Sequence, residues 1–302
     1  MTRFAGIYTP LITPFTGTGA LDESGLRSNV ERYMSSSLTG LVVLGSNGEA
    51  PQLEEGEADR AIAVVRGAMP LNRPLLAGTG RESTAATIAA TARAADLGVD
   101  AVLVRTPAFF KSQMSSDVFV RHYSDVADRS PVPVFLYNVT MYTGVNLLPD
   151  AVATLSQHPN IIGMKESGND MAQFAEYLAR SRQGFVVLAG AASTYYSALT
   201  LGAHGAILAV AGAAPEICVR IHELVAAEQF QDAQQLQRRL APLAKSVGAT
   251  YGVAGLKAAL DLLGYAGGAP RPPLQPIGPG AIAAIRAQLT ELDLLEAAHA
   301  PK

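Results

Sequence analysis

The chain has 302 residues, of which 49% are hydrophobic and only 16% are charged, with a formal net charge of −3. This balance predicts a large buried core rather than disorder. Nucleic acid is not expected as a partner, because neutralising phosphates requires clustered lysine and arginine. The single cysteine, Cys218, cannot form an intrachain disulfide, and no apolar run reaches the about 18 residues of a membrane span. We therefore expect a cytoplasmic protein that does not bind a membrane.

Short apolar runs recur along the chain, and most are followed by glycine, proline, serine or threonine. Continuous apolar runs are typical of parallel strands that are buried on both faces. The expected strands are residues 5–8, 41–44, 75–77, 101–104, 134–137, 161–165, 185–188 and 206–209. Most segments between them have helical periodicity, such as 83–97, which starts with a serine, and 149–157, which starts with a proline.

This alternation predicts an α/β fold, a (β/α)8 TIM barrel, over residues 1–224. A doubly wound open sheet is the alternative. No Gly-x-Gly-x-x-Gly follows the first strand, however, and regular units suit closure better. Residues 225–302 lack strand signals and predict a C-terminal extension of three helices, at 228–245, 250–264 and 279–296, that packs on the barrel or builds an oligomer contact.

Lys165 ends one of the apolar runs, where a buried strand is expected to run out. Burial disfavours the charged ammonium and favours the neutral amine, which is the form that attacks a carbonyl carbon to give a Schiff base. A lysine at a strand end, taken alone, more often reaches into solvent. The neighbouring residues therefore decide between the two interpretations.

In a barrel of this kind, active sites lie at the carboxyl ends of the strands. The loop Gly45-Ser46-Asn47-Gly48 follows the second strand and offers a hydroxyl, an amide and backbone N–H groups that can hold a carboxylate, or it is a tight turn without a ligand. Tyr137 ends the fifth strand, as a proton-transfer group or as a packed aromatic. Phe109 and Phe110 indicate a hydrophobic wall or a subunit contact rather than catalysis.

Other kinds of site find no support in the sequence. The histidines show no metal-ligand spacing, and His222 lacks a second histidine four residues on, so we expect no metal site. Gly-x-Ser-x-Gly and Walker motifs are missing as well. Lys165 is therefore the strongest nucleophile candidate.

At these residues the chain resembles the pyruvate-dependent lyases of the dihydrodipicolinate synthase and N-acetylneuraminate lyase superfamily. The resemblance rests on three segments in order, Gly45-Ser46-Asn47-Gly48-Glu49, Tyr137-Asn138-Val139 with Thr143-Gly144, and Gly163-Met164-Lys165-Glu166-Ser167. Within that superfamily the nearest likeness is to 4-hydroxy-2-oxoglutarate aldolase, through the pair Ser46-Asn47, the run from Thr154 to Asn160, and Ser167.

The resemblance implies a role for each of these residues. Lys165 forms the imine with a 2-oxo carbon, Tyr137 moves the proton of the aldol hydroxyl, and Ser46 and Asn47 hold the adjacent carboxylate. Further substrate contacts are expected at Ser167, Gly190 and Ile207. The resemblance also implies a small 2-oxo acid as substrate, no metal or dissociable cofactor, and a homotetramer with Phe109 or Phe110 near a subunit contact.

Two residues depart from the superfamily's pattern. Tyr142 stands where the synthases carry an arginine that holds the carboxylate of a semialdehyde, and a phenol cannot replace a bidentate guanidinium. Phe109 stands where the family has a second relay tyrosine. Both departures affect the expected specificity wall of the site.

The main expectation is therefore a class I, Schiff-base lyase that cleaves a 4-hydroxy-2-oxo acid, such as 4-hydroxy-2-oxoglutarate, to pyruvate and an aldehyde, here glyoxylate. Three alternatives stay open. They are a 2-oxo-3-deoxy sugar-acid aldolase or dehydratase, dihydrodipicolinate synthase, and a non-catalytic protein that binds an oxo acid.

Overall fold

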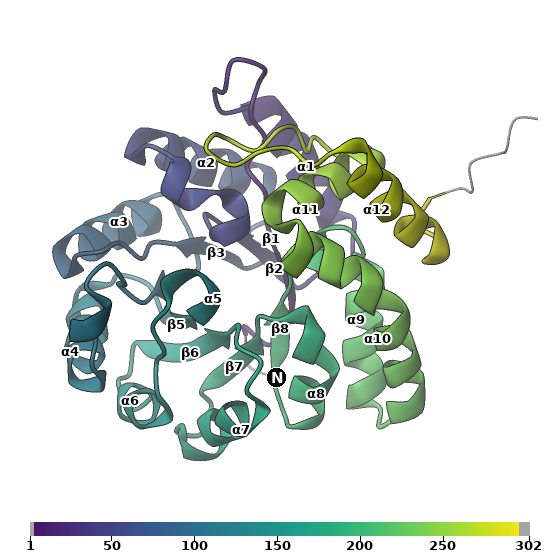
Figure 1. The fold of residues 1–302 in the computed structure, drawn as a ribbon. Coiled ribbons are helices and arrows are strands. Elements are labelled where there is room, and N and C mark those ends of the chain that lie inside the picture. The colour runs from purple at the N-terminus through teal and green to yellow at the C-terminus, as the bar shows by residue number, and fades with distance from the viewer. Residues whose placement is uncertain (1–2, 296–302) are drawn as a thin grey trace, which may run out of the picture.

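The computed structural model describes residues 3–295, in which eight parallel strands follow one another around a closed barrel. The strands lie at the centre of the molecule, with helices arranged around them (Figure 1). Their bounds are β1 Gly6–Pro10, β2 Gly40–Val43, β3 Leu75–Gly78, β4 Ala101–Arg105, β5 Val134–Asn138, β6 Ile161–Glu166, β7 Val186–Ala189 and β8 Gly205–Ile207. The expected TIM barrel is confirmed, and the doubly wound alternative is wrong because β8 pairs with β1.

Helices follow every strand. They are α1 Glu23–Met34, α2 Glu55–Ala68, α3 Thr84–Asp96, α4 Ser116–Arg129, the short α5 Thr140–Thr143, α6 Pro149–Leu155, α7 Met171–Arg180, α8 Tyr195–Thr200 and α9 Pro215–Ala226. Two local sequence signals act as expected: the Ser83 hydroxyl accepts a hydrogen bond from the Ala86 N–H and caps α3, and Pro149 occupies the first turn of α6.

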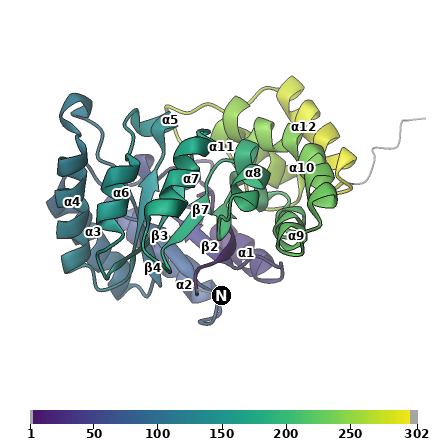
Figure 2. The ribbon, with the colours of Figure 1, turned by 90° about the horizontal axis from the view of Figure 1, so that it is seen from below.

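The C-terminal extension consists of α10 Phe230–Lys245, α11 Gly252–Leu262 and α12 Pro279–Glu291. These helices lie together beside α9, on one side of the molecule (Figures 1 and 2). Helix α9 crosses the expected boundary at residue 224 and ends at Ala226. The helix expected at 250–264 starts later, because α10 continues into a π-helical turn over Ser246–Thr250 before α11 begins. Residue 296, the expected end of the last helix, lies outside the described residues.

Two strands end earlier than the apolar runs predict. Leu44 follows β2 with a φ of 56°, so the chain turns out of the sheet one residue sooner than expected. Strand β8 ends at Ile207, and Ala209–Gly212 forms a 3-10 turn instead of more strand. Leu44 and Leu208 are buried in these connections rather than in the sheet.

Side chains alternate between the two faces of each strand, as the pleat requires. In β4, Leu103 belongs to the cluster that fills the barrel, whereas Val102 and Val104 pack toward the helices. Arg105, two residues after Leu103, therefore lies on the inward side at the carboxyl end of β4. None of the helices within residues 3–295 combines the length and apolarity needed to cross a bilayer.

Candidate active site

Three long polar side chains stand in register at the carboxyl end of the barrel. Arg105 of β4 is the partner of Tyr137 in β5, and Tyr137 is the partner of Lys165 in β6. Partners in a parallel sheet lie side by side on the same face. The side chains of Tyr137 and Lys165 are each only 5% exposed, so the lysine is buried rather than extended into solvent.

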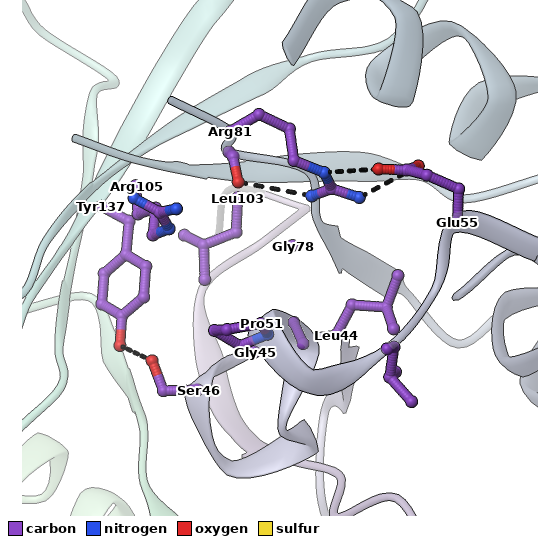
Figure 3. A pocket seen from close by; sticks show the side chains of 13 residues that line it. Leu44, Gly45, Ser46, Pro51, Glu55, Gly78, Arg81, Leu103, Arg105 and Tyr137 are labelled. Carbon is purple, nitrogen blue, oxygen red and sulfur yellow. Dashed lines mark hydrogen bonds and ion pairs between the residues drawn. The ribbon is translucent and has the colours of Figure 1, made fainter. Parts of the chain in front are cut away.

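A hydroxyl links the lysine to the loop after β2. The Nζ atom of Lys165 lies 3.5 Å from the Tyr137 hydroxyl and 4.5 Å from the centroid of its ring. The same hydroxyl lies 3.4 Å from Oγ of Ser46, and Figure 3 shows the two groups pointing toward each other. These distances are at the long end of hydrogen bonding, as is common in catalytic sites before substrate tightens them.

The stem of Lys165 packs against the end of β7. A Cβ atom at Gly190 would lie 2.1 Å from Oγ of Ser167 and 2.8 Å from Cε of Lys165, so any other residue would force both side chains to move. The Ser167 hydroxyl is buried and has no hydrogen-bond partner among the described residues. Ser167 and Gly190 thus border the lysine, while Ile207 is buried in the barrel interior.

The Ser46–Gly48 segment is a 3-10 turn that ends at Glu49, whose φ is 54°. It is anchored from the C-terminal extension. Oε1 of Glu49 lies 2.6 Å from Nζ of Lys257 in α11, and both side chains are fully buried. Burial lowers the pKa of Lys257, although the adjacent Glu49 carboxylate opposes this change. The backbone N–H of Arg271 donates to Oε2 of Glu49 over 2.7 Å.

The side chains of Asn138 and Glu166 connect the ends of β5 and β6 on the outer face of the barrel. Nδ2 of Asn138 donates to Oε2 of Glu166 over 2.7 Å, and Oδ1 of Asn138 accepts from the Leu147 N–H. Burial raises the pKa of Glu166. Since these residues directly follow Tyr137 and Lys165, they hold the two strand ends that carry the site. The sequence does carry a signal for Asn138 and Glu166. Each is a polar residue that directly follows an inward-facing residue at a strand end.

Two adjoining cavities of about 250 and 520 Å³ open at this end of the barrel, and both are lined by Ser46, Pro51 and Arg105. The smaller one also contacts Tyr137, and the larger one contacts Asn47 and Tyr142. The extension supplies part of the wall of the larger cavity, through Tyr251, Gly252, Val253, Ala254, Leu274 and Gln275.

The aromatic residues expected near the site lie toward its outside. Phe109 and Phe110 are 78% and 63% exposed and pack edge to face, with ring centroids 5.1 Å apart. Tyr142 is 60% exposed, on the short helix α5. Cys218 is fully buried, and burial raises the pKa of its thiol. Across residues 3–295, His, Cys, Asp and Glu side chains form no group of three or more that could hold a metal ion.

A closed barrel with a buried lysine next to a tyrosine at its carboxyl end fits the class of pyruvate-dependent, Schiff-base lyases. The particular family follows from comparison with known proteins. The chain belongs to the dihydrodipicolinate synthetase family, whose family model matches residues 3–292. Enzymes of this family use a lysine Schiff base with pyruvate and need no external cofactor.

Relatives match over nearly the whole chain. The 4-hydroxy-tetrahydrodipicolinate synthase of Methanothrix thermoacetophila is 35% identical over 96% of this chain and 97% of its own length. The protein of the same name from Methanoculleus marisnigri is 36% identical, over 90% of this chain and 93% of its own.

Solved structures show the same likeness. Dihydrodipicolinate synthase from Thermotoga maritima superposes with a TM-score of 0.93 and 28% identity, over 97% of this chain and all of its own. The Acinetobacter baumannii synthase in complex with pyruvate gives a TM-score of 0.91 and 28% identity, over 96% and 99%. These names are synthases, so the expected likeness to 4-hydroxy-2-oxoglutarate aldolase stays a prediction.

Proposed function

We propose that Lys165 forms an imine with the 2-oxo group of pyruvate, or of a longer 2-oxo acid, and that the enzyme makes or breaks the carbon–carbon bond next to it. The observation that carries the proposal is the continuous contact from the buried Lys165 amine through the Tyr137 hydroxyl to Ser46. A buried amine supplies the nucleophile, and an adjacent hydroxyl supplies the proton relay that such a reaction needs.

In the cleavage direction, neutral Lys165 attacks C2 of a 4-hydroxy-2-oxo acid, and loss of water gives the protonated imine. Tyr137 takes the proton of the C4 hydroxyl as it passes its own phenol proton to water, while the C3–C4 bond breaks and the electron pair of that bond flows into the imine to give an enamine. The aldehyde leaves, C3 takes a proton back from water through Tyr137, and a second water molecule hydrolyses the imine to release pyruvate and the free lysine. Ser46 and Asn47 hold the C1 carboxylate, with Ser167 beside the imine. The imine is the electron sink, so this chemistry requires no dissociable cofactor.

The first candidate for the overall reaction is that of 4-hydroxy-tetrahydrodipicolinate synthase, in which the pyruvate enamine adds to aspartate semialdehyde. Whole-length relatives at 34–36% identity carry this name. Their names favour this reaction over the cleavage that we expected from the sequence.

Cleavage of 4-hydroxy-2-oxoglutarate to pyruvate and glyoxylate is the second candidate, and two residues of the site favour it. Tyr142 lines the larger cavity where the synthases carry an arginine. Phe109 offers no hydroxyl for proton relay. The Phe109 departure suits a reaction in which Tyr137 alone transfers the proton. The Tyr142 departure argues against the semialdehyde that the synthases hold with their arginine.

Borohydride trapping tests the shared chemistry. Pyruvate and borohydride should leave a stable adduct on Lys165, located by peptide mapping, and the Lys165→Ala variant should carry none. A wild-type peptide with unmodified Lys165 contradicts the proposal.

A substrate panel then separates the candidates. Pyruvate release from 4-hydroxy-2-oxoglutarate and from 2-oxo-3-deoxy sugar acids is compared with condensation of pyruvate and aspartate semialdehyde. The reaction with the highest kcat/KM identifies the second substrate. An adduct without turnover on any of them supports an oxo-acid-binding protein.

A further inference from the structure

Arg105 lies in the same row as the two residues to which we assign the chemistry. It is in register with Tyr137, which is in register with Lys165. Neighbouring strands are about 4.8 Å apart, so the backbones of β4 and β6 are separated by about 10 Å. Arg105 and Lys165 therefore lie at the same end of the barrel, one strand to either side of Tyr137. Figure 3 shows Arg105 next to Tyr137 at the wall of the smaller cavity.

The guanidinium of Arg105 keeps an unused edge. Its Nη1 atom lies 2.8 Å from Oε1 of Glu82 and donates to the Thr106 carbonyl over 3.1 Å. Among residues 3–295, neither Nε nor Nη2 of this side chain, which is 29% exposed, has a hydrogen-bond partner. The Nε–Nη2 edge of an arginine matches a carboxylate with two parallel hydrogen bonds.

The charges around the cavities single out this arginine. Of the described residues that line the larger cavity, Arg105 is the only cation. Arg81 lines the smaller cavity, but its Nε and Nη2 donate to Glu55 at 2.9 and 3.3 Å. Burial alone would raise the pKa of Glu82, but hydrogen bonds from the Ala108 and Phe109 N–H groups and from Arg105 lower it. Glu82 therefore stays ionised and anchors one side of the guanidinium.

We propose that Arg105 binds the second carboxylate of the substrate and thereby selects dicarboxylic substrates. The inference rests on the proposed function, because the proposed function places the imine carbon at Lys165 and the C4 hydroxyl at Tyr137. The next group along a five-carbon chain, a C5 carboxylate, then falls toward β4 and Arg105. Lys165, Tyr137 and Arg105 thus follow one another across β6, β5 and β4 in the same order as C2, C4 and C5 along the substrate. Tyr142, a neutral residue, supplies no charge to this position.

Reductive trapping measures this contact without requiring turnover. The probes are pyruvate, 2-oxoglutarate and 2-oxopentanoate, of which the last two have equal chain length and end in a carboxylate and a methyl group. The measured quantity is the acid concentration that gives half-maximal adduct on Lys165. In Arg105→Met we expect this concentration to rise about 10–100-fold for 2-oxoglutarate and to change less than about threefold for the other two acids.

Two control variants separate a binding role from a structural one. Arg81→Met removes a cation whose hydrogen bonds go to Glu55, and we expect the three concentrations to keep their wild-type ratio. Glu82→Gln removes the anchor of Arg105 but leaves the free edge, so 2-oxoglutarate should still be preferred over 2-oxopentanoate.

Three results would overturn the assignment. The first is that Arg105→Met leaves the half-maximal concentration of 2-oxoglutarate unchanged. The second is that Arg105→Met raises the half-maximal concentrations of all three acids equally. The third is that Glu82→Gln loses the preference for 2-oxoglutarate as fully as Arg105→Met does. Failure of pyruvate to trap in the wild type is a different result, since it removes the imine itself and so refutes the proposed function.

Discussion

Tyr137 lies between the proposed nucleophile and the loop that we propose binds the carboxylate, and its hydroxyl is within 3.5 Å of both Lys165 and Ser46. With Phe109 lacking a hydroxyl, no second phenol is assigned to the relay. In the proposed mechanism, bond cleavage therefore depends on one oxygen atom, whereas formation of the imine with pyruvate depends on the lysine.

Replacing Tyr137 by phenylalanine should separate these two steps. We expect kcat for the aldol step to fall about 100-fold or more, because a positioned acid–base group contributes about 10²–10⁴-fold. Trapping of pyruvate on Lys165 should persist. Tyr195→Phe is a matched control, since the Tyr195 hydroxyl donates to the Cys218 carbonyl, away from the site. Equal kcat losses in the two variants would argue against the relay.

Gly190→Ala should affect the lysine itself. The new methyl group would meet Oγ of Ser167 at 2.1 Å and Cε of Lys165 at 2.8 Å, and both side chains must move. We expect the rate of pyruvate trapping to fall at least about tenfold, because a misplaced nucleophile loses its near-attack geometry. Gly67→Ala, at a position in α2 where the added methyl group meets nothing within 4 Å, controls for adding a methyl group without a clash. A Gly190→Ala enzyme with a wild-type trapping rate would contradict this packing argument.

Among the elements, the 3-10 turn Ser46–Gly48 and helix α11 depend on each other. Lys257 and Glu49 form a fully buried ion pair, and Arg271 adds a backbone hydrogen bond to the same carboxylate. Thr13 donates its hydroxyl hydrogen to the Gly48 carbonyl over 2.6 Å. The turn that presents Ser46 is thus fixed from two sides, one of them outside the barrel.

Lys257→Met should destabilise the protein and loosen this turn. Removing one partner leaves the Glu49 carboxylate buried and unpaired, at a cost of about 3–5 kcal/mol in the free energy of unfolding. Urea denaturation measures the loss, and KM for pyruvate should rise as well. The double variant Lys257→Met/Glu49→Gln should lose less stability, because no charge stays buried. Equal losses in the single and double variants would show that the ion pair is not the cause.

The elements of this protein differ in how well their sequence predicts them. Buried parallel strands leave continuous apolar runs, so the barrel and the strand-end positions of Tyr137 and Lys165 follow from pattern alone. Arg105 directly follows the apolar run at 101–104, so the run itself does not predict that Arg105 belongs to the strand. Its position two residues after Leu103 nevertheless places it on the inward face. The buried pair Lys257–Glu49 joins segments far apart in the chain, and local patterns carry no information about such contacts.

For the molecule as a whole, stability in acid depends on groups whose pKa values change on folding, and His122 and Glu57 are two whose pKa values fall far. Desolvation lowers the pKa of His122 to about 4, and its Nε2 has no partner among the described residues. A hydrogen bond from Arg271 lowers the pKa of Glu57 to about 2. Both folded-state values lie below those of the unfolded chain, so in each case the unfolded state takes up protons first as the pH falls.

The free energy of unfolding should therefore decrease in two stages. His122 contributes stability above pH 6.5 that is lost as the pH falls toward 4, about 3 kcal/mol in total. The contribution of Glu57 is present above pH 4.5 and is lost as the pH falls toward 2. Denaturant titrations from about pH 7.5 to about pH 3 measure the first stage, which His122→Gln should flatten. An unchanged pH dependence in that variant would assign the loss to other groups.

Assembly is the remaining expectation at this scale. The family resemblance predicts a homotetramer, and the exposed edge-to-face pair Phe109–Phe110 is the expected contact. Light scattering of the wild type measures the mass directly, and Phe110→Asp should lower it if this pair lies in an interface. A monomeric wild type would contradict the prediction.

The C-terminal extension forms part of the wall of the larger cavity, through residues such as Tyr251 and Leu274. In the proposed mechanism the strand ends carry the reacting groups, whereas this wall borders the space beyond them. We therefore expect substitutions at Tyr251 or Leu274 that keep the Lys257–Glu49 ion pair to alter the accepted chain length and to leave imine formation unchanged. In this proposal, reaction type and substrate size are encoded in separate parts of one chain, and each can diverge while the other is kept.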